Sequence, residues 1–113
     1  MKYAGHANRV NLTNVESVPG KTIVEHYGLV QGSTIRAKHL GKDILAGFKN
    51  LVGGELTGYT ELLMESRDEA LNRMSAQAGE LGANAVINVR LSTSSIAQGA
   101  AEILAYGTAV RVE

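Results

Sequence analysis

The sequence predicts an α+β fold in the order β-β-α-α-β-β, with a mainly antiparallel sheet and one long helix. Alternating, β-branched segments near both ends predict the strands, apolar residues at helical spacing in the middle predict the helices, and glycines mark the breaks. The chain has 113 residues, the length of one domain. We expect residues 1–8 to form a loose lead-in and residues 9–113 a single domain.

The N-terminal part predicts two strands. Apolar and polar residues alternate over 10–14, which favours a first strand. Pro19-Gly20 is typical of a turn, because proline presets φ and glycine accepts a positive φ. Residues 22–30 are β-branched and aromatic and predict a second strand. We expect the two strands to pair as a hairpin with a wide loop.

Two helices are expected in the middle of the chain. A short one starts near Lys38 and ends at Gly53-Gly54. A long one runs from Thr57, a plausible N-cap, to Leu81, and Gly82 follows it in the left-handed conformation. The apolar stripe of the long helix consists of Leu63, Ala70, Met74, Ala78 and Leu81.

Two further strands are predicted near the C-terminus, over residues 85–92 and 103–112, with a flexible loop of small residues over 94–101 between them. On the first of these strands Ala85, Ile87, Val89 and Leu91 share one face. On the last strand a row of small residues suits close contact with the long helix, and this row is Ala105, Gly107 and Ala109. The opposite face of that strand presents Leu104, Tyr106, Val110 and Val112.

Composition excludes several classes of function. Lys and Arg number 11 and so do Asp and Glu, so no basic excess favours nucleic acid or a membrane surface as a partner. The chain has no cysteine, which removes disulfides, thiolate metal sites and cysteine nucleophiles. Residues 1–9 lack the apolar core of a signal peptide, and no stretch has the length of a membrane span. These features predict a cytoplasmic protein.

The apolar surface predicts self-association. One long helix covers about one face of a small sheet, so the face with Leu104 and Tyr106 would remain in water. Burial of apolar area is favourable by about 25 cal/mol per Å². Leaving several apolar side chains exposed therefore loses several kcal/mol of folding free energy, a large share of a small domain's stability. The partner we expect is a second copy of the chain. In the alternative, the helices and the N-terminal hairpin cover everything within one chain.

Six segments together resemble the YbjQ-like proteins, in the order in which that family has them. They are Thr22–Gly32, Gly47–Gly54, Thr57–Glu61, Arg67–Ala70, Leu81–Val86 and Tyr106–Val110. The resemblance implies a dodecin-like subunit that forms a closed ring of five copies, either single or stacked in pairs. It implies no biochemical activity. The family carries a heavy-metal-binding label, and the absence of cysteine from this chain is a departure that weighs against a soft-metal role.

The histidines are the candidates for a metal site. His26 and His39 could bind a metal ion only together with carboxylates of another subunit, because neither stands in a chelating pair. Glu25 is adjacent to His26 on a strand and therefore points to the opposite face. The alternative, which we favour, is that neither histidine binds a metal: His26 is then a strand residue and His39 a residue at the start of a helix. No cofactor is predicted beyond that metal ion.

Interface or ligand contacts are expected at Arg67, Glu61 and Tyr106. Arg67 lies in or beside the apolar stripe, where a cation needs a partner such as Glu25, Glu61 or a neighbouring subunit's carboxylate. An anionic ligand is the alternative partner. No catalytic motif is present: position 36 is arginine where a phosphate loop needs glycine, and no Gly-x-Ser-x-Gly occurs. An enzyme would need a pocket between subunits, so the chain is expected to act as a binding or structural module.

Overall fold

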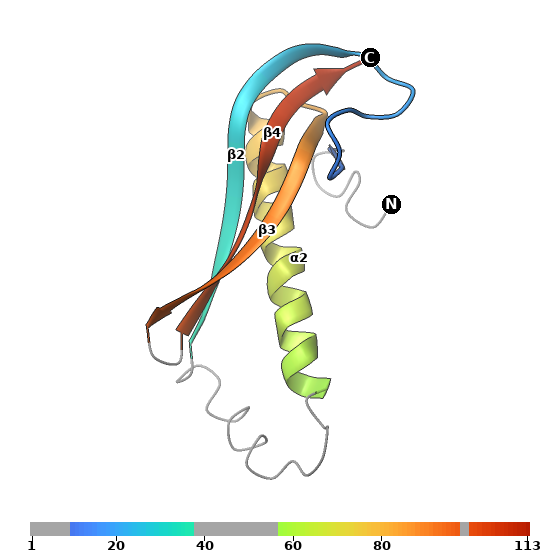
Figure 1. Ribbon diagram of the computed structural model, residues 1–113. Coiled ribbons are helices and arrows are strands. Elements are labelled where there is room, and N and C mark those ends of the chain that lie inside the picture. Colours follow the sequence, from blue (N-terminus) through green and yellow to red (C-terminus); the bar gives the residue numbers. More distant parts are fainter. Residues whose placement is uncertain (1–9, 38–56, 98–99) are drawn as a thin grey trace.

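The computed structural model describes residues 10–37, 57–97 and 100–113. The elements in chain order are β1 (Asn11–Leu12), β2 (Ile23–Ala37), α2 (Thr57–Glu80), β3 (Ala85–Ala97) and β4 (Ala100–Val112). The expected α+β class is confirmed, since α2 lies along one face of a mixed, 4-stranded sheet (Figure 1). The short helix expected after Lys38 lies outside the described residues. Within them, no helix combines the length and the apolar character needed to cross a bilayer.

The strand order is β1-β3-β4-β2, so β4 lies between its antiparallel partners β2 and β3. The expected hairpin between the first two strands is wrong. β1 instead pairs in parallel with β3, with Asn11 beside Ala85, and the Thr13 N–H donates to the Val86 carbonyl at 3.0 Å. The segment 13–22 crosses the end of the sheet and carries the chain from one edge to the other (Figure 1).

The loop expected over residues 94–101 is also wrong, because β3 and β4 continue through most of it. Ser94 lies opposite Glu102, and Ala97 lies opposite Ala100. Serine, alanine and glycine have weak strand preferences of their own. Cross-strand pairing overrides this preference, since each strand supplies the other with backbone hydrogen bonds.

Small residues bring α2 close to the sheet. Ala70, Met74 and Ala78 of the predicted stripe are fully buried, and they share one core with Ala105 and Ala109 of the predicted small-residue row. On β2, a Cβ atom at Gly32 would collide with the backbone of Ala70 and Met74. The stripe and the row are therefore confirmed at these positions, whereas the space beside Gly107 is closed by Val86, Ile87 and Val89 of β3. Leu81 is the exception, since it follows the last helical residue and is 47% exposed.

A β-bulge breaks the alternation expected for β3. Ile87 pairs with Thr108 and Arg90 pairs with Tyr106, so Asn88 and Val89 together oppose Gly107. Asn88 has a φ of 55°, the left-handed conformation that the first residue of such a bulge requires. The bulge turns Val89 toward the core beneath α2, and not to the face of Ile87 as predicted.

The face of the sheet opposite α2, here called the open face, is covered only at one end. There Val110, Val112, Ala85 and Ile87 form a second small cluster against Val18 and Ile23. The expectation that Val110 and Val112 stay uncovered is therefore wrong, because the chain before β2 folds over them. Leu104 is half-buried and Tyr106 is 36% exposed.

Candidate functional site

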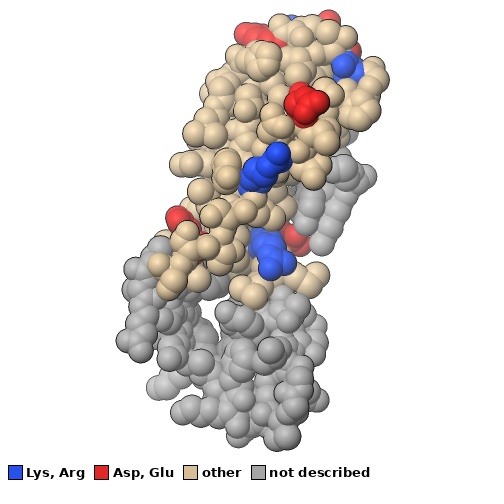
Figure 2. Space-filling view, in the orientation of Figure 1, with Lys and Arg blue, Asp and Glu red and all other residues tan. Residues whose placement is uncertain are grey.

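The uncovered part of the open face combines apolar and polar side chains from three strands. Tyr106 of β4 lies opposite Gln31 of β2 and Arg90 of β3. Directly opposite residues share a face, and the same register places Leu29 and Ile35 here. Leu29 is 71% exposed and Ile35 is 51% exposed. Figure 2, seen with the strands in front of α2, shows only scattered charged side chains on the described part of this surface.

Arg90 joins the open face to the segment before β2. Its Nη1 atom donates to the Asn14 carbonyl at 2.8 Å and to the Val89 carbonyl at 3.0 Å. The Asn88 N–H donates to the Val15 carbonyl at 2.9 Å on the same segment. The bulge and Arg90 thus hold residues 13–15 beside β3.

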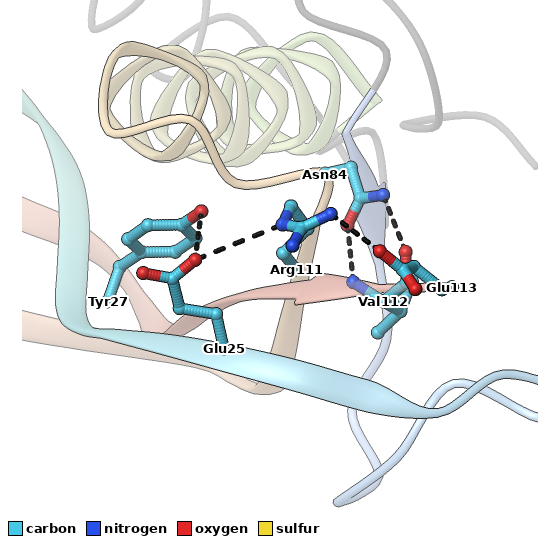
Figure 3. A network of polar contacts seen from close by, with 6 residues as sticks. All are labelled: Glu25, Tyr27, Asn84, Arg111, Val112 and Glu113. Atoms are coloured by element: carbon cyan, nitrogen blue, oxygen red, sulfur yellow. Dashed lines mark hydrogen bonds and ion pairs between the residues drawn. The ribbon is translucent and has the colours of Figure 1, made fainter.

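A network of polar side chains lies on the other face, near the C-terminal end of α2 (Figure 3). The Tyr27 hydroxyl donates to Glu25 Oε1 at 3.2 Å, and that oxygen lies 3.9 Å from Arg111 Nε. Arg111 Nη1 donates to Glu113 Oε2 at 2.8 Å. Asn84 binds the Val112 backbone beside them.

Glu113 favours the charged form of Arg111. Its hydrogen bond and its negative charge raise the pKa of Arg111 above the usual value for a guanidinium. Arg111 is therefore a cation at neutral pH. Because Glu25 and Glu113 flank it, the network is an ion-paired cluster at the surface, which contributes modestly to stability.

The structure separates the residues expected to form a metal site. His26 is exposed on β2 and lies opposite Val110, whereas Glu25 belongs to the network on the other face, as the sequence predicted. His39 lies outside the described residues. No group of three His, Cys, Asp or Glu side chains within the described ranges could hold a metal ion, and the whole chain lacks cysteine. The described residues of one subunit therefore do not fit a metal centre.

The expected interface residues are also dispersed. Arg67 is exposed on α2, and its neighbour Ser66 occupies the buried position of that turn. Of the two positions expected for Arg67, in or beside the apolar stripe, the structure shows the second. Glu25, named as one partner for Arg67, contacts Tyr27 and Arg111 instead. Glu61 lies in α2, with its side chain outside the described part of the chain.

Sequence reasoning missed the network around Arg111. A signal for it was present, because two pairs of polar residues stand two apart, Glu25 with Tyr27 on a predicted strand and Arg111 with Glu113 at the end of another. Residues at this spacing point to the same face. The spacing alone does not show that β2 and β4 pair in a register that joins the two pairs.

These features define a small α+β subunit with one helix on one face of a mixed sheet and an open face on the other. A crystal structure of a protein with unknown function from Pediococcus pentosaceus has this fold, with a TM-score of 0.61 at 16% identity over 92% of this chain and 98% of that chain. The family model YbjQ, described as "Putative heavy-metal-binding", matches residues 10–113. The chain belongs to this family, and the resemblance noted in its sequence is confirmed.

Curated relatives agree over nearly their full length. A UPF0145 protein of Hahella chejuensis is 67% identical over 90% of this chain and 98% of its own. A UPF0145 protein of Archaeoglobus fulgidus is 59% identical over 89% of this chain and 94% of its own. Bacterial and archaeal relatives thus share most of this sequence, and their names state no activity.

Proposed function

We propose that this protein works as a homo-oligomeric binding or structural module in which copies meet through the open face. The observation that carries this proposal is the exposure of Leu29 at 71%, Ile35 at 51% and Tyr106 at 36% on one face. Such a patch on a small protein is typical of an interaction surface. Removing it from water is favourable by about 25 cal/mol per Å² of apolar area.

A closed ring is the assembly that we propose. A ring uses two different surfaces of each copy. When the ring closes, every copy makes the same two contacts and no interface is left free. The number of five copies follows from the resemblance to YbjQ-like and dodecin-like subunits. The described contacts favour a partner for the open face. Segment 13–22 covers Val110 and Val112 but leaves Tyr106 exposed.

Light scattering coupled to size exclusion tests this proposal. The wild-type protein at micromolar concentration is expected to exceed the 12.0 kDa of one chain several-fold. Leu29→Asp places a charge in the proposed interface and is expected to lower the mass, whereas Asn72→Asp, at an exposed position of α2, is the matched control. A wild-type mass of 12.0 kDa would overturn the proposal.

Metal binding at a subunit interface is the alternative function. Its support is the description of the family model and the exposure of His26 on the open face, where a neighbouring copy could supply carboxylates. The test is metal analysis of protein purified without a histidine tag. The double variant His26→Ala, His39→Ala is expected to lose the metal, and His6→Ala to retain it. Unchanged metal content in the double variant excludes this site.

A further inference from the structure

The two outer edges of the sheet differ in how their backbone groups are satisfied. On β2, the Gln31 N–H donates to Gln77 Oε1 at 2.7 Å, and Arg73 Nη1 donates to the Ser33 carbonyl at 2.5 Å. Both side chains belong to α2. The helix therefore supplies polar partners to the outward backbone groups of β2, where a further strand would otherwise bind.

This arrangement fixes which groups point outward on β3. Because Gln31 and Ser33 direct their peptide groups away from β4, their partners Tyr106 and Leu104 direct theirs toward β3. The residues of β3 opposite them, Arg90 and Ser92, point inward. By alternation, the outward backbone groups belong to Leu91, Thr93 and Ser95.

The outer edge of β3 carries no strand beyond the bulge, within the described residues. β1 pairs with Ala85 and Val86, and the segment that follows β1 reaches only Asn88 and Val89. Residues 91–97 contain no charge, no proline and no glycine. Charged side chains, proline and bulges are the features that protect exposed edges from strand addition. Residues 91–95 lack all of them, since the two register shifts of β3 lie before Arg90 and after Ser95.

We propose that the outer edge of β3 binds β3 of a second copy, antiparallel, around a two-fold axis at Thr93. This inference rests on the proposed homo-oligomeric function and names one of its contacts. A second copy has the same two edges to offer, and α2 already supplies partners to β2, so the β3 edge is the one available. An antiparallel edge is complementary to itself, as a two-fold contact requires.

The side chains fit this register. Thr93 faces Thr93 of the second copy, and Leu91 faces Ser95 of the second copy. Paired threonines are favourable cross-strand neighbours. Leu91 is 46% exposed in one chain, and the added strand covers it. Since a two-fold contact joins copies in pairs, it is distinct from the contact that closes a ring.

Cysteine cross-linking tests the register directly, because the chain contains no cysteine. In Thr93→Cys the paired Cα atoms would lie about 5.5 Å apart, within the range of a disulfide. A covalent dimer is expected after mild oxidation. Ser95→Cys is the matched control, because it lies on the same edge and face but about 13 Å from its copy. Failure of Thr93→Cys to cross-link, or equal cross-linking of both variants, overturns the register.

Thr93→Pro tests the contact by mass. It removes an outward N–H and leaves the bonds between β3 and β4 intact, so the mass is expected to fall two-fold, while Thr93→Ser keeps the wild-type mass. A wild-type protein of 12.0 kDa refutes the proposed function itself. If the protein is an oligomer, Thr93→Pro keeps the wild-type mass and Thr93→Cys does not cross-link, only this contact is refuted. If circular dichroism shows that Thr93→Pro is unfolded, the comparison of Thr93→Cys with Ser95→Cys tests the contact instead.

Discussion

Asn84 binds Val112 through both polar atoms of its side-chain amide. The Nδ2 atom donates to the Val112 carbonyl at 2.9 Å, and Oδ1 accepts from the Val112 N–H at 2.8 Å. β3 begins one residue later, at Ala85, so no backbone of β3 is available to pair with Val112. The amide therefore replaces a strand residue and satisfies the last peptide groups of β4.

Removing this amide is expected to destabilise the protein. Asn84→Ala loses both hydrogen bonds to Val112, and the free energy of unfolding should fall by about 1–3 kcal/mol. Asn84→Asp keeps the acceptor but loses the donor and should show a comparable or smaller loss. Urea unfolding measures both, with Asn14→Ala at an exposed position as the control. A loss in Asn84→Ala no larger than in Asn14→Ala contradicts this role.

Gly32 is expected to tolerate no side chain. A Cβ atom there meets the backbone of Ala70 and Met74, which cannot move without shifting α2. Gly32→Ala should lower the free energy of unfolding by about 1–3 kcal/mol or more. Thermal unfolding followed by circular dichroism measures the effect, and Ser33→Ala on the opposite face is the control. Equal stability of the two variants would show that the close approach has no energetic importance.

Asn88 is expected to be replaceable by glycine but not by alanine. At a φ of 55°, alanine is strained by about 1–2 kcal/mol, whereas glycine adopts this conformation freely. Urea unfolding should therefore place Asn88→Gly at or above the wild type and Asn88→Ala about 1 kcal/mol below Asn88→Gly. The reverse order of the two variants would contradict the bulge.

The contribution of Arg111 to stability is expected to be independent of pH near neutrality. Glu113 raises the pKa of Arg111 in the folded protein, so the stabilisation is fully present below the pKa of the unfolded chain and disappears only as the pH rises through the folded value. The pKa values of Arg111 in the folded and in the unfolded chain both lie far above neutral pH. The difference in free energy of unfolding between wild type and Arg111→Gln should stay constant from pH 6 to 9, as measured by urea unfolding. A change within that range would contradict this assignment.

Local signals predicted the interface between α2 and the sheet. The spacing of Ala70, Met74 and Ala78, and the small residues around Gly107, specify which faces meet, and Gly82 ends the helix with a φ of 94°. Each of these features depends on residues close in the sequence. Burial of small side chains on both partners then allows the short distance that Gly32 shows.

Non-local pairing could not be predicted in the same way. The partner of β1 is β3, far along the chain, and a strand of 2 residues carries almost no pattern of its own. The bulge at Asn88 reverses the face of Val89, although the sequence alternates cleanly there. For the candidate site, the open face was predicted at Tyr106, but the covering of Val110 by Val18 depends on the path of a loop.

The central position of β4 has a consequence for the order of events during synthesis. β4 is synthesised after β2 and β3, the two strands with which it pairs, so Ile23 cannot pair until Val112 has been made. Until β4 emerges, neither of these neighbours has its main hydrogen-bonding partner, although Ala70 and Met74 of α2 can already pack beside Gly32 of β2. The sheet therefore forms only after Ala100–Val112 has been synthesised, and it depends on contacts of large sequence separation.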